Sequence, residues 1–192
     1  MDQFQTKITR AFRDNNRKLD HLQNDINNIK IELAKLHILP QKVKTILLTH
    51  SDSDHTASIS LFENANVYLS KPEEQLINGE TSRFLFFGNT VDADPYTLLE
   101  DQEELLLANT NIKCILLPGH TPGSMAYLIN DQYLFVGDAM GIENETIIPF
   151  NSFFNMDSEQ ALASMNIIYD MNDIEMIFTA HHGFLKVSSD TR

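Results

Sequence analysis

Four short apolar runs in this 192-residue chain each end in a residue that can bind a metal ion. They read ILLTH, which ends at His50, ILLPGH, which ends at His120, YLFVGD, which ends at Asp138, and MIFTAHHG, which contains His181 and His182. Each run has the length and apolar content of a buried strand. Strand ends are rigid and the loops after them face solvent, so sites are commonly built there. The pattern predicts one site assembled from four strand ends.

The segment after the first run is especially rich in potential ligands. Residues 50–55 read HSDSDH, with a small serine after each of the first two ligands. In an extended loop, His50, Asp52 and Asp54 would point the same way, and His55 would open the next helix. Imidazole and carboxylate groups are ligands for zinc, iron or manganese. A lone Gly-Asp or His-His-Gly is usually an ordinary turn, but all four segments in this order predict a metal site.

From Val43 onward, apolar runs of strand length alternate with helical or polar stretches. The expected strands are 43–48, 67–69, 84–87, 96–99, 103–107, 112–117, 125–129, 133–136 and 174–178. We expect helices over 56–62 and from Asp157 to about 171, a helix start at 71–74, a hairpin turn at 130–132 and a loop over 141–156. This mixture predicts a layered α/β domain.

The first 36 residues differ from the rest in charge and periodicity. They carry a net charge of +2, whereas the remainder carries −15. Apolar residues spaced by three and four positions run from Leu19 to Leu36 and predict an amphipathic helix, which Pro40 ends. The stripe fits a dimer contact or a helix packed on the core, and we favour the latter because it spans fewer than three heptads. The predicted organisation is an N-terminal helix over 1–36 and a domain over 37–192.

Composition limits which binding partners and which cellular compartment are expected for this chain. The net charge of −13 argues against nucleic acid or an anionic membrane surface, so a small-molecule substrate is expected. The chain has neither the apolar core of a signal peptide nor an apolar stretch long enough to span a membrane. Its single cysteine, Cys114, lies in an apolar run and cannot form an intramolecular disulfide, which fits a cytoplasmic protein.

Taken together, the motifs resemble those of the metallo-β-lactamase-fold hydrolases. The matching segments are Thr49–His55, Pro118–Gly123, Gly137-Asp138 and His181-His182-Gly183, within about residues 31–185. The resemblance implies an αββα sandwich. The stretch PGHTPGS is similar to that of glyoxalase II-like thioesterases and of general hydrolases of the fold. Family members usually begin with a β-hairpin region, which this sequence lacks before His50, and the amphipathic helix stands in its place.

The same resemblance implies two divalent metal ions, zinc as the first choice with iron or manganese as alternatives. One ion would be held by His50, Asp52 and His120, the other by Asp54, His55 and His181 (with His182 as the rival), and Asp138 would bridge them. Asp52 departs from the family pattern, which has histidine there. A carboxylate hardens the site and favours iron or manganese, and flavo-diiron proteins are similar in using one.

The implied activity is hydrolysis of an ester, thioester or phosphoester by a hydroxide shared between the two metals. Asp54 is the residue expected to orient or accept the proton. Two alternatives stay open from the sequence. One is a di-iron redox protein, suggested by Asp52, and the other is a catalytically degraded member that acts in protein interaction. A homodimer through the N-terminal helix is the expected form of such an interaction.

Overall fold

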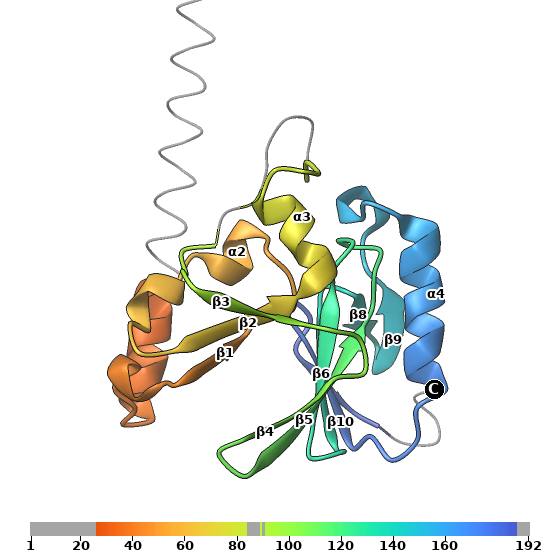
Figure 1. The fold of residues 1–192 in the computed structure, drawn as a ribbon. Helices are drawn as coiled ribbons and strands as arrows, with labels where there is room; N and C mark the ends of the chain where they lie inside the picture. Colours follow the sequence, from red (N-terminus) through yellow and green to blue (C-terminus); the bar gives the residue numbers. More distant parts are fainter. Residues whose placement is uncertain (1–25, 84–88, 90, 188–192) are drawn as a thin grey trace, which may run out of the picture.

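The computed structural model describes residues 26–83, 89 and 91–187. Its strands form a small and a large sheet that pack against each other, with helices on the outer faces (Figure 1). Helices and strands are mixed along the chain: short helices follow the first two strands of the small sheet, and one long helix precedes the last two strands of the large sheet. The predicted αββα sandwich is confirmed.

The small sheet is parallel and consists of β1 (Thr45–Leu47), β2 (Asn66–Ser70) and β3 (Tyr96–Leu99), in that order. Side chains alternate along β2 as the two-residue period of a strand requires. Val67 and Leu69 are buried in one apolar cluster with Leu48 and Ile59. Tyr68 points the other way and joins a second cluster, which fills the space between the sheets.

Six strands make up the large sheet, in the order β11-β10-β7-β6-β5-β4. They are β4 (Glu104–Leu107), β5 (Thr110–Leu116), β6 (Met125–Ile129), β7 (Tyr133–Gly137), β10 (Met176–Thr179) and β11 (Phe184–Lys186). Only the β7–β10 pair is parallel. Helix α4 (Ser158–Tyr169) covers one face, where its Met165 and Ile168 join the same core cluster as Leu134 and Ile177. The side chain of Asp157 caps this helix by accepting a hydrogen bond from the backbone N–H of Gln160, as predicted.

Most predicted strands are present, but two predictions were wrong. Residues 141–156 are not a loop: they hold the hairpin β8 (Met140–Glu143) and β9 (Thr146–Pro149), followed by the 3-10 turn η4 (Ser152–Phe154). The two turn residues of the β8–β9 hairpin, Asn144 and Glu145, both have the positive φ angles of a primed turn. The sequence did not indicate this turn, because Asn-Glu lacks the glycine that usually marks it.

The helix predicted over 56–62 was also misplaced. Helix α2 spans Ser53–Thr56, and a separate 3-10 turn, η2, spans Ile59–Leu61. The backbone carbonyl of Asp52 accepts hydrogen bonds from the N–H groups of His55 and Thr56, so the helical turn begins earlier than the apolar pattern suggested. The remaining short helices are η1 (Pro40–Lys42), η3 (Lys71–Glu73) and α3 (Glu74–Ile77).

Part of the predicted N-terminal helix is described. Residues 26–35 are helical, and none of them is buried. On the predicted stripe, Ile26, Ile29 and Leu33 are half-buried and Leu36 is 67% exposed, so no stripe residue in the described part of the chain is fully buried. The rest of the predicted helix and the strand predicted at 84–87 lie outside the described residues. The homodimer through this helix stays a prediction.

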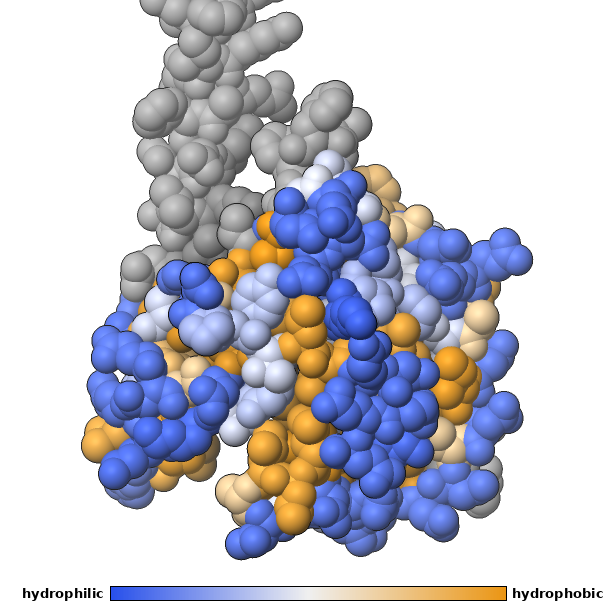
Figure 2. Space-filling model, viewed as in Figure 1, coloured by the Kyte–Doolittle hydropathy of each residue, from blue (hydrophilic) through white to orange (hydrophobic). Residues whose placement is uncertain are grey.

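The surface seen in Figure 2 is largely hydrophilic, with apolar side chains gathered over β4 and β5, where Leu106 is 70% exposed. No helix in the described ranges is both long enough and apolar enough to cross a membrane.

Candidate metal centre

The structure brings together all seven residues predicted as ligands, in two neighbouring sets that share Asp138. We call His50, Asp52 and His120 the inner set, and Asp54, His55 and His181 the outer set. Within each set the potential ligand atoms lie within 4.8 Å of one another, and His50, His55 and Asp138 form a third such group that joins the sets. The inner set is mostly buried, and the outer set faces solvent.

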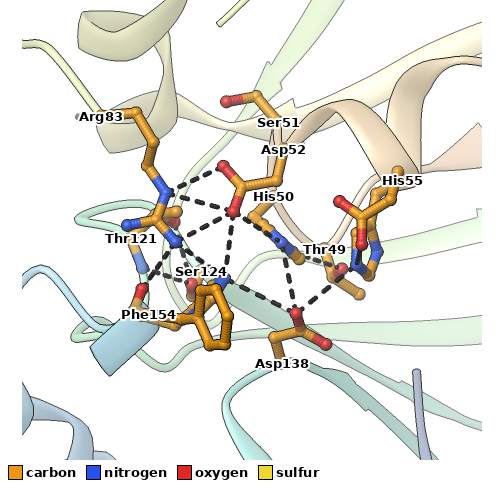
Figure 3. A network of polar contacts seen from close by, with 12 residues as sticks. Thr49, His50, Ser51, Asp52, His55, Arg83, Thr121, Ser124, Asp138 and Phe154 are labelled. Carbon is orange, nitrogen blue, oxygen red and sulfur yellow. Dashed lines mark hydrogen bonds and ion pairs between the residues drawn. The ribbon is translucent and has the colours of Figure 1, made fainter. Parts of the chain in front are cut away.

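In the inner set, two imidazoles face two carboxylates. His120 Nε2 lies 3.2 Å from Asp52 Oδ2 and 3.6 Å from Asp138 Oδ2. His50 Nε2 lies 3.7 Å from Asp52 Oδ2 and 3.9 Å from Asp138 Oδ2. Figure 3 shows His50 and Arg83 on opposite sides of the Asp52 carboxylate.

The outer set has the same arrangement around the other side of Asp138. His181 Nε2 lies 3.4 Å from both Asp54 Oδ2 and Asp138 Oδ1. His55 Nε2 lies 3.7 Å from Asp54 Oδ2 and 3.6 Å from Asp138 Oδ2. Tetrahedral zinc with ligand bonds of about 2.0–2.2 Å separates its ligand atoms by about 3.3–3.6 Å. The contacts in the two sets, 3.2–3.9 Å, lie within a few tenths of an ångström of what a tetrahedral ion requires.

The strands explain why these side chains meet. His50 follows β1, Asp138 follows β7, and His181 lies in the turn between β10 and β11. His182 has no ion-pair contact like that of His181, and its ring lies near Phe150 instead, with ring centroids 6.1 Å apart. The expected common direction of residues 50, 52 and 54 was wrong, because α2 begins at Ser53 and turns Asp54 into the outer set.

Several ligand atoms are buried without a hydrogen-bond partner: His50 Nε2, His55 Nε2 and Asp138 Oδ1. Buried polar atoms in native proteins nearly always have a partner, so each such atom needs an explanation. Divalent cations at the two sets would supply the missing partners. The donor set of imidazole nitrogens and carboxylate oxygens is also the one that zinc prefers. The residues present therefore fit a divalent metal ion.

Burial and neighbouring charges shift the pKa values of His50 and Asp138 so that both are in the form that binds a cation. Burial lowers the pKa of His50 well below its ordinary value, and the charges of His55 and His120 add to this effect. Its imidazole is therefore neutral at neutral pH, which is the form that binds metal. Burial opposes the ionisation of Asp138, but the hydrogen bond from His55 and the charges of His50, His55 and His181 together outweigh burial and lower the pKa of Asp138. Asp138 is therefore an anion among histidines.

His55 shows the opposite balance. Burial acts to lower its pKa, but the neighbouring Asp138 and Asp54 carboxylates outweigh burial and raise it. A cation bound to the outer set would take over the charge that this proton carries, and metal binding would release the proton.

Two residues that sequence reasoning missed hold Asp52. Arg83 donates from Nε to Asp52 Oδ1 at 2.9 Å and from Nη2 to Asp52 Oδ2 at 2.9 Å, which is a bidentate ion pair. Asn89 Nδ2 donates to Asp52 Oδ1 at 2.9 Å. Burial opposes the ionisation of Asp52, but hydrogen bonds from His120 and Arg83 outweigh burial and hold the pKa of Asp52 far below its usual range. Arg83 also donates to the carbonyl oxygen of Phe154.

A third missed residue, Glu73, joins the two loops that carry the inner set. Its side chain is fully buried, and its Oε1 accepts hydrogen bonds from the N–H and the hydroxyl of Ser51. Its Oε2 accepts from the Thr121 hydroxyl and the Gly123 N–H. Gly123 must be glycine here, because an added Cβ would collide with the backbone of Glu73.

An aromatic wall borders the centre. The Phe150 ring packs edge-on against His120, with centroids 5.1 Å apart, and lies 6.3 Å from the ring of His181. Phe154 lies next to Phe150 at 6.4 Å and is 44% exposed. The ligands therefore have polar partners on one side and an apolar surface on the other.

The hydroxyl of Thr49 contacts the His50 ring at Nδ1, the nitrogen that does not face the carboxylates, so it should affect the metal affinity of His50. Its Oγ1 lies 3.1 Å from His50 Nδ1, and it packs against Gly137. Outer partners of ligating histidines commonly contribute 10- to 100-fold in metal affinity, so Thr49→Val should weaken divalent metal binding that involves His50 by about 10-fold. Metal titration of the metal-free protein measures this effect. Thr45→Val, at the start of β1, is the control, and equal affinities of the two variants would contradict the assignment.

Comparisons with known proteins agree with the fold and the motifs. Residues 15–181 match the family model of the metallo-beta-lactamase superfamily. The chain is 28% identical over 168 residues to a "probable metallo-hydrolase" of Methanocaldococcus jannaschii, which covers 87% of this chain and 71% of that protein. It is 31% identical over 119 residues to PksB of Bacillus subtilis, named as a "probable polyketide biosynthesis zinc-dependent hydrolase", which covers 58% of this chain and 47% of that one.

Among solved structures, the BLEG-1 B3 metallo-beta-lactamase superposes with a TM-score of 0.64 at 22% identity, over 84% of this chain and 79% of that chain. At this identity the likeness speaks for the fold alone. The family model covers most of the sequence, and the named relatives are metallo-hydrolases. The chain belongs to the metallo-β-lactamase superfamily.

Proposed function

We propose that the protein is a zinc-dependent hydrolase that cleaves an ester or thioester bond. The observation that carries this proposal is the pair of ligand sets around Asp138, with His50 Nε2, His55 Nε2 and Asp138 Oδ1 buried without a hydrogen-bond partner among the described residues. Fold alone says little about chemistry, so the argument rests on these atoms. The inner set, the outer set and Asp138 are the proposed ligands. Zinc is proposed because the ligand spacing suits tetrahedral coordination and because PksB is named as zinc-dependent.

Bound divalent metal supplies Lewis acidity, which polarises a carbonyl group and lowers the pKa of a water molecule. Asp54 is the proposed proton acceptor. Its side chain is 52% exposed, so substrate and solvent can reach it, and its Oδ2 lies beside His55 and His181. Asp138 and Asp52 orient the buried imidazoles of His50 and His120 through the contacts described above.

The aromatic wall favours an ester or thioester over a phosphoester. Phe150, with its ring centroid 5.1 Å from that of His120, and Phe154 beside it offer apolar contact area that suits a carbon-rich acyl group. A phosphoester would bring further negative charge to a protein of net charge −13. The similarity of the PGHTPGS stretch to glyoxalase II-like thioesterases points the same way.

The di-iron redox alternative depended on Asp52 as a metal-ligating carboxylate. In the structure this carboxylate is held by Arg83 and Asn89, so its presence has an explanation other than a preference for iron. No contact in the described part of the chain favours redox chemistry over hydrolysis.

A small substrate panel tests the proposal. The zinc-loaded protein should hydrolyse p-nitrophenyl butyrate and the butyryl thioester of N-acetylcysteamine, and a chelator should abolish the turnover. We expect kcat/KM for both to exceed that for bis-p-nitrophenyl phosphate at least about 10-fold, since the wall suits apolar groups. Phe150→Ala should lower kcat/KM for butyryl more than for acetyl substrates, by about 10-fold, as expected for lost methylene contacts.

Phe153→Ala is the matched control, because Phe153 is 78% exposed and packs on Phe154 rather than on a ligand. Turnover that resists the chelator, or that is confined to the phosphodiester, would contradict the proposal.

A further inference from the structure

The carboxylate of Asp52 is already occupied by protein donors. Arg83 donates to both of its oxygens, and Asn89 adds a further hydrogen bond to Oδ1. A carboxylate offers about four lone-pair positions. Arg83 Nε–H (shared between the two oxygens), one N–H of Arg83 Nη2 and one of Asn89 therefore occupy most of the acceptor capacity that a metal ion at the inner set would need from this residue.

The same guanidinium reaches a second ligand of the inner set. Arg83 Nη2 lies 3.1 Å from His120 Nε2, the atom that also faces Asp52 and Asp138. Arginine cannot accept a hydrogen bond, so a permanent positive charge lies against the ring nitrogen that would face a metal ion at the inner set. Arg83 thus engages two of the three ligands of the inner set.

The inner and outer sets also differ in the balance of their charges. The side chain of Arg83 is 3% exposed and that of Asp52 is 17% exposed, so their charges cancel with little screening by solvent. The outer set has no such balance, because Asp54 pairs with His55 and His181, which are neutral when they bind metal. Asp138 serves both sets. A dication is therefore drawn more strongly to the outer set.

We propose that Arg83 acts as a built-in cation of the inner set, so that the protein binds one divalent ion tightly at Asp54, His55, His181 and Asp138, and a second only weakly. This inference rests on the metal centre proposed above and refines it. The Asp52–Arg83 pair then replaces the neutral histidine of the family pattern with two charges that sum to zero. The net local charge is therefore the same as with histidine, but Asp52 is no longer available as a metal ligand.

Titration of the metal-free protein with Co²⁺ and Zn²⁺, followed by calorimetry and by the visible spectrum of Co²⁺, tests this inference. The wild type should bind one equivalent, with a second at least about 100-fold weaker, because a neighbouring buried charge shifts binding by several kcal/mol. Arg83→Gln should strengthen the second equivalent at least about 10-fold and leave the first within about 3-fold, since it removes only the cation of the inner set.

Lys71→Gln is the matched control. It also removes one positive charge, but Lys71 is exposed and pairs with Glu100 on the surface, so both affinities should stay unchanged. If Arg83→Gln unfolds because it leaves Asp52 without its partner, Asp52→His/Arg83→Gln restores a neutral inner set. This double variant should bind two equivalents of similar affinity.

Two equivalents of equal affinity in the wild type would overturn the inference and leave the proposed hydrolase intact. No bound equivalent at all would overturn both. An unchanged second affinity in folded Arg83→Gln would also overturn the inference.

Discussion

Asp138→Asn should lose divalent metal from both ligand sets at once. Its Oδ2 faces His50, His120 and His55, and its Oδ1 faces His181, so among the described residues it is the one carboxylate that contacts histidines of both sets. The asparagine keeps the shape but removes the charge and one acceptor oxygen. We expect metal content after dialysis to fall below about one tenth of the wild type, and kcat/KM on the ester probe to fall at least about 1,000-fold.

Elemental analysis and the ester assay together check this prediction. Asp131→Asn is the control, because Asp131 lies in the exposed turn between β6 and β7 and makes no contact with the centre. Full metal content in Asp138→Asn would show that Asp138 is not a shared ligand. Circular dichroism should give the same spectrum for both variants in their metal-free forms.

Glu73→Ala should cause the largest loss of stability of any single substitution near the centre. It removes a fully buried carboxylate that accepts four hydrogen bonds from Ser51, Thr121 and Gly123. The donors left behind would be buried without partners. We expect the free energy of unfolding to fall by about 4 kcal/mol, which corresponds to a melting temperature about 8–16 °C lower in a domain of this size.

Thermal and urea denaturation of the metal-free protein measure this loss without any contribution from metal. Glu73→Gln, which keeps one acceptor oxygen, should lose about half as much. Glu80→Ala, at an exposed position beyond α3, should leave the melting temperature unchanged. A loss of under about 1 kcal/mol in Glu73→Ala would mean that the two loops hold their positions without this carboxylate.

That these potential ligands lie close together could be predicted from the sequence, because each segment that carries them follows an apolar run. His50, Asp138 and His181 sit directly behind strands whose periodicity is readable, and strand ends bring such side chains to a common edge. The choice of His181 over His182 followed from the same reasoning, and the ion-pair distances agree with it. The layered α/β architecture could be predicted for the same reason.

The partners of these ligands could not be predicted, because their roles come from contacts between distant segments. Arg83 reaches across 31 positions to Asp52, from a stretch without clear periodicity. The only signal in the sequence is that Arg83 is the sole cation between Lys71 and Lys113, among nine acidic residues. Glu73 lies in Lys-Pro-Glu-Glu, which indicates an exposed helix start, and only its tertiary contacts bury it.

The hairpin that carries His181 gives metal binding a second role. Strand β11 pairs only with β10 at the edge of the large sheet, and its Phe184 is 64% exposed. Edge elements of this kind open locally at a fraction of the cost of global unfolding. An ion that requires His181 binds only the closed hairpin, so part of its binding free energy is used to keep that edge closed. Removal of the ion would therefore make the β10–β11 hairpin at the edge of the large sheet open more often, in addition to leaving the metal centre empty.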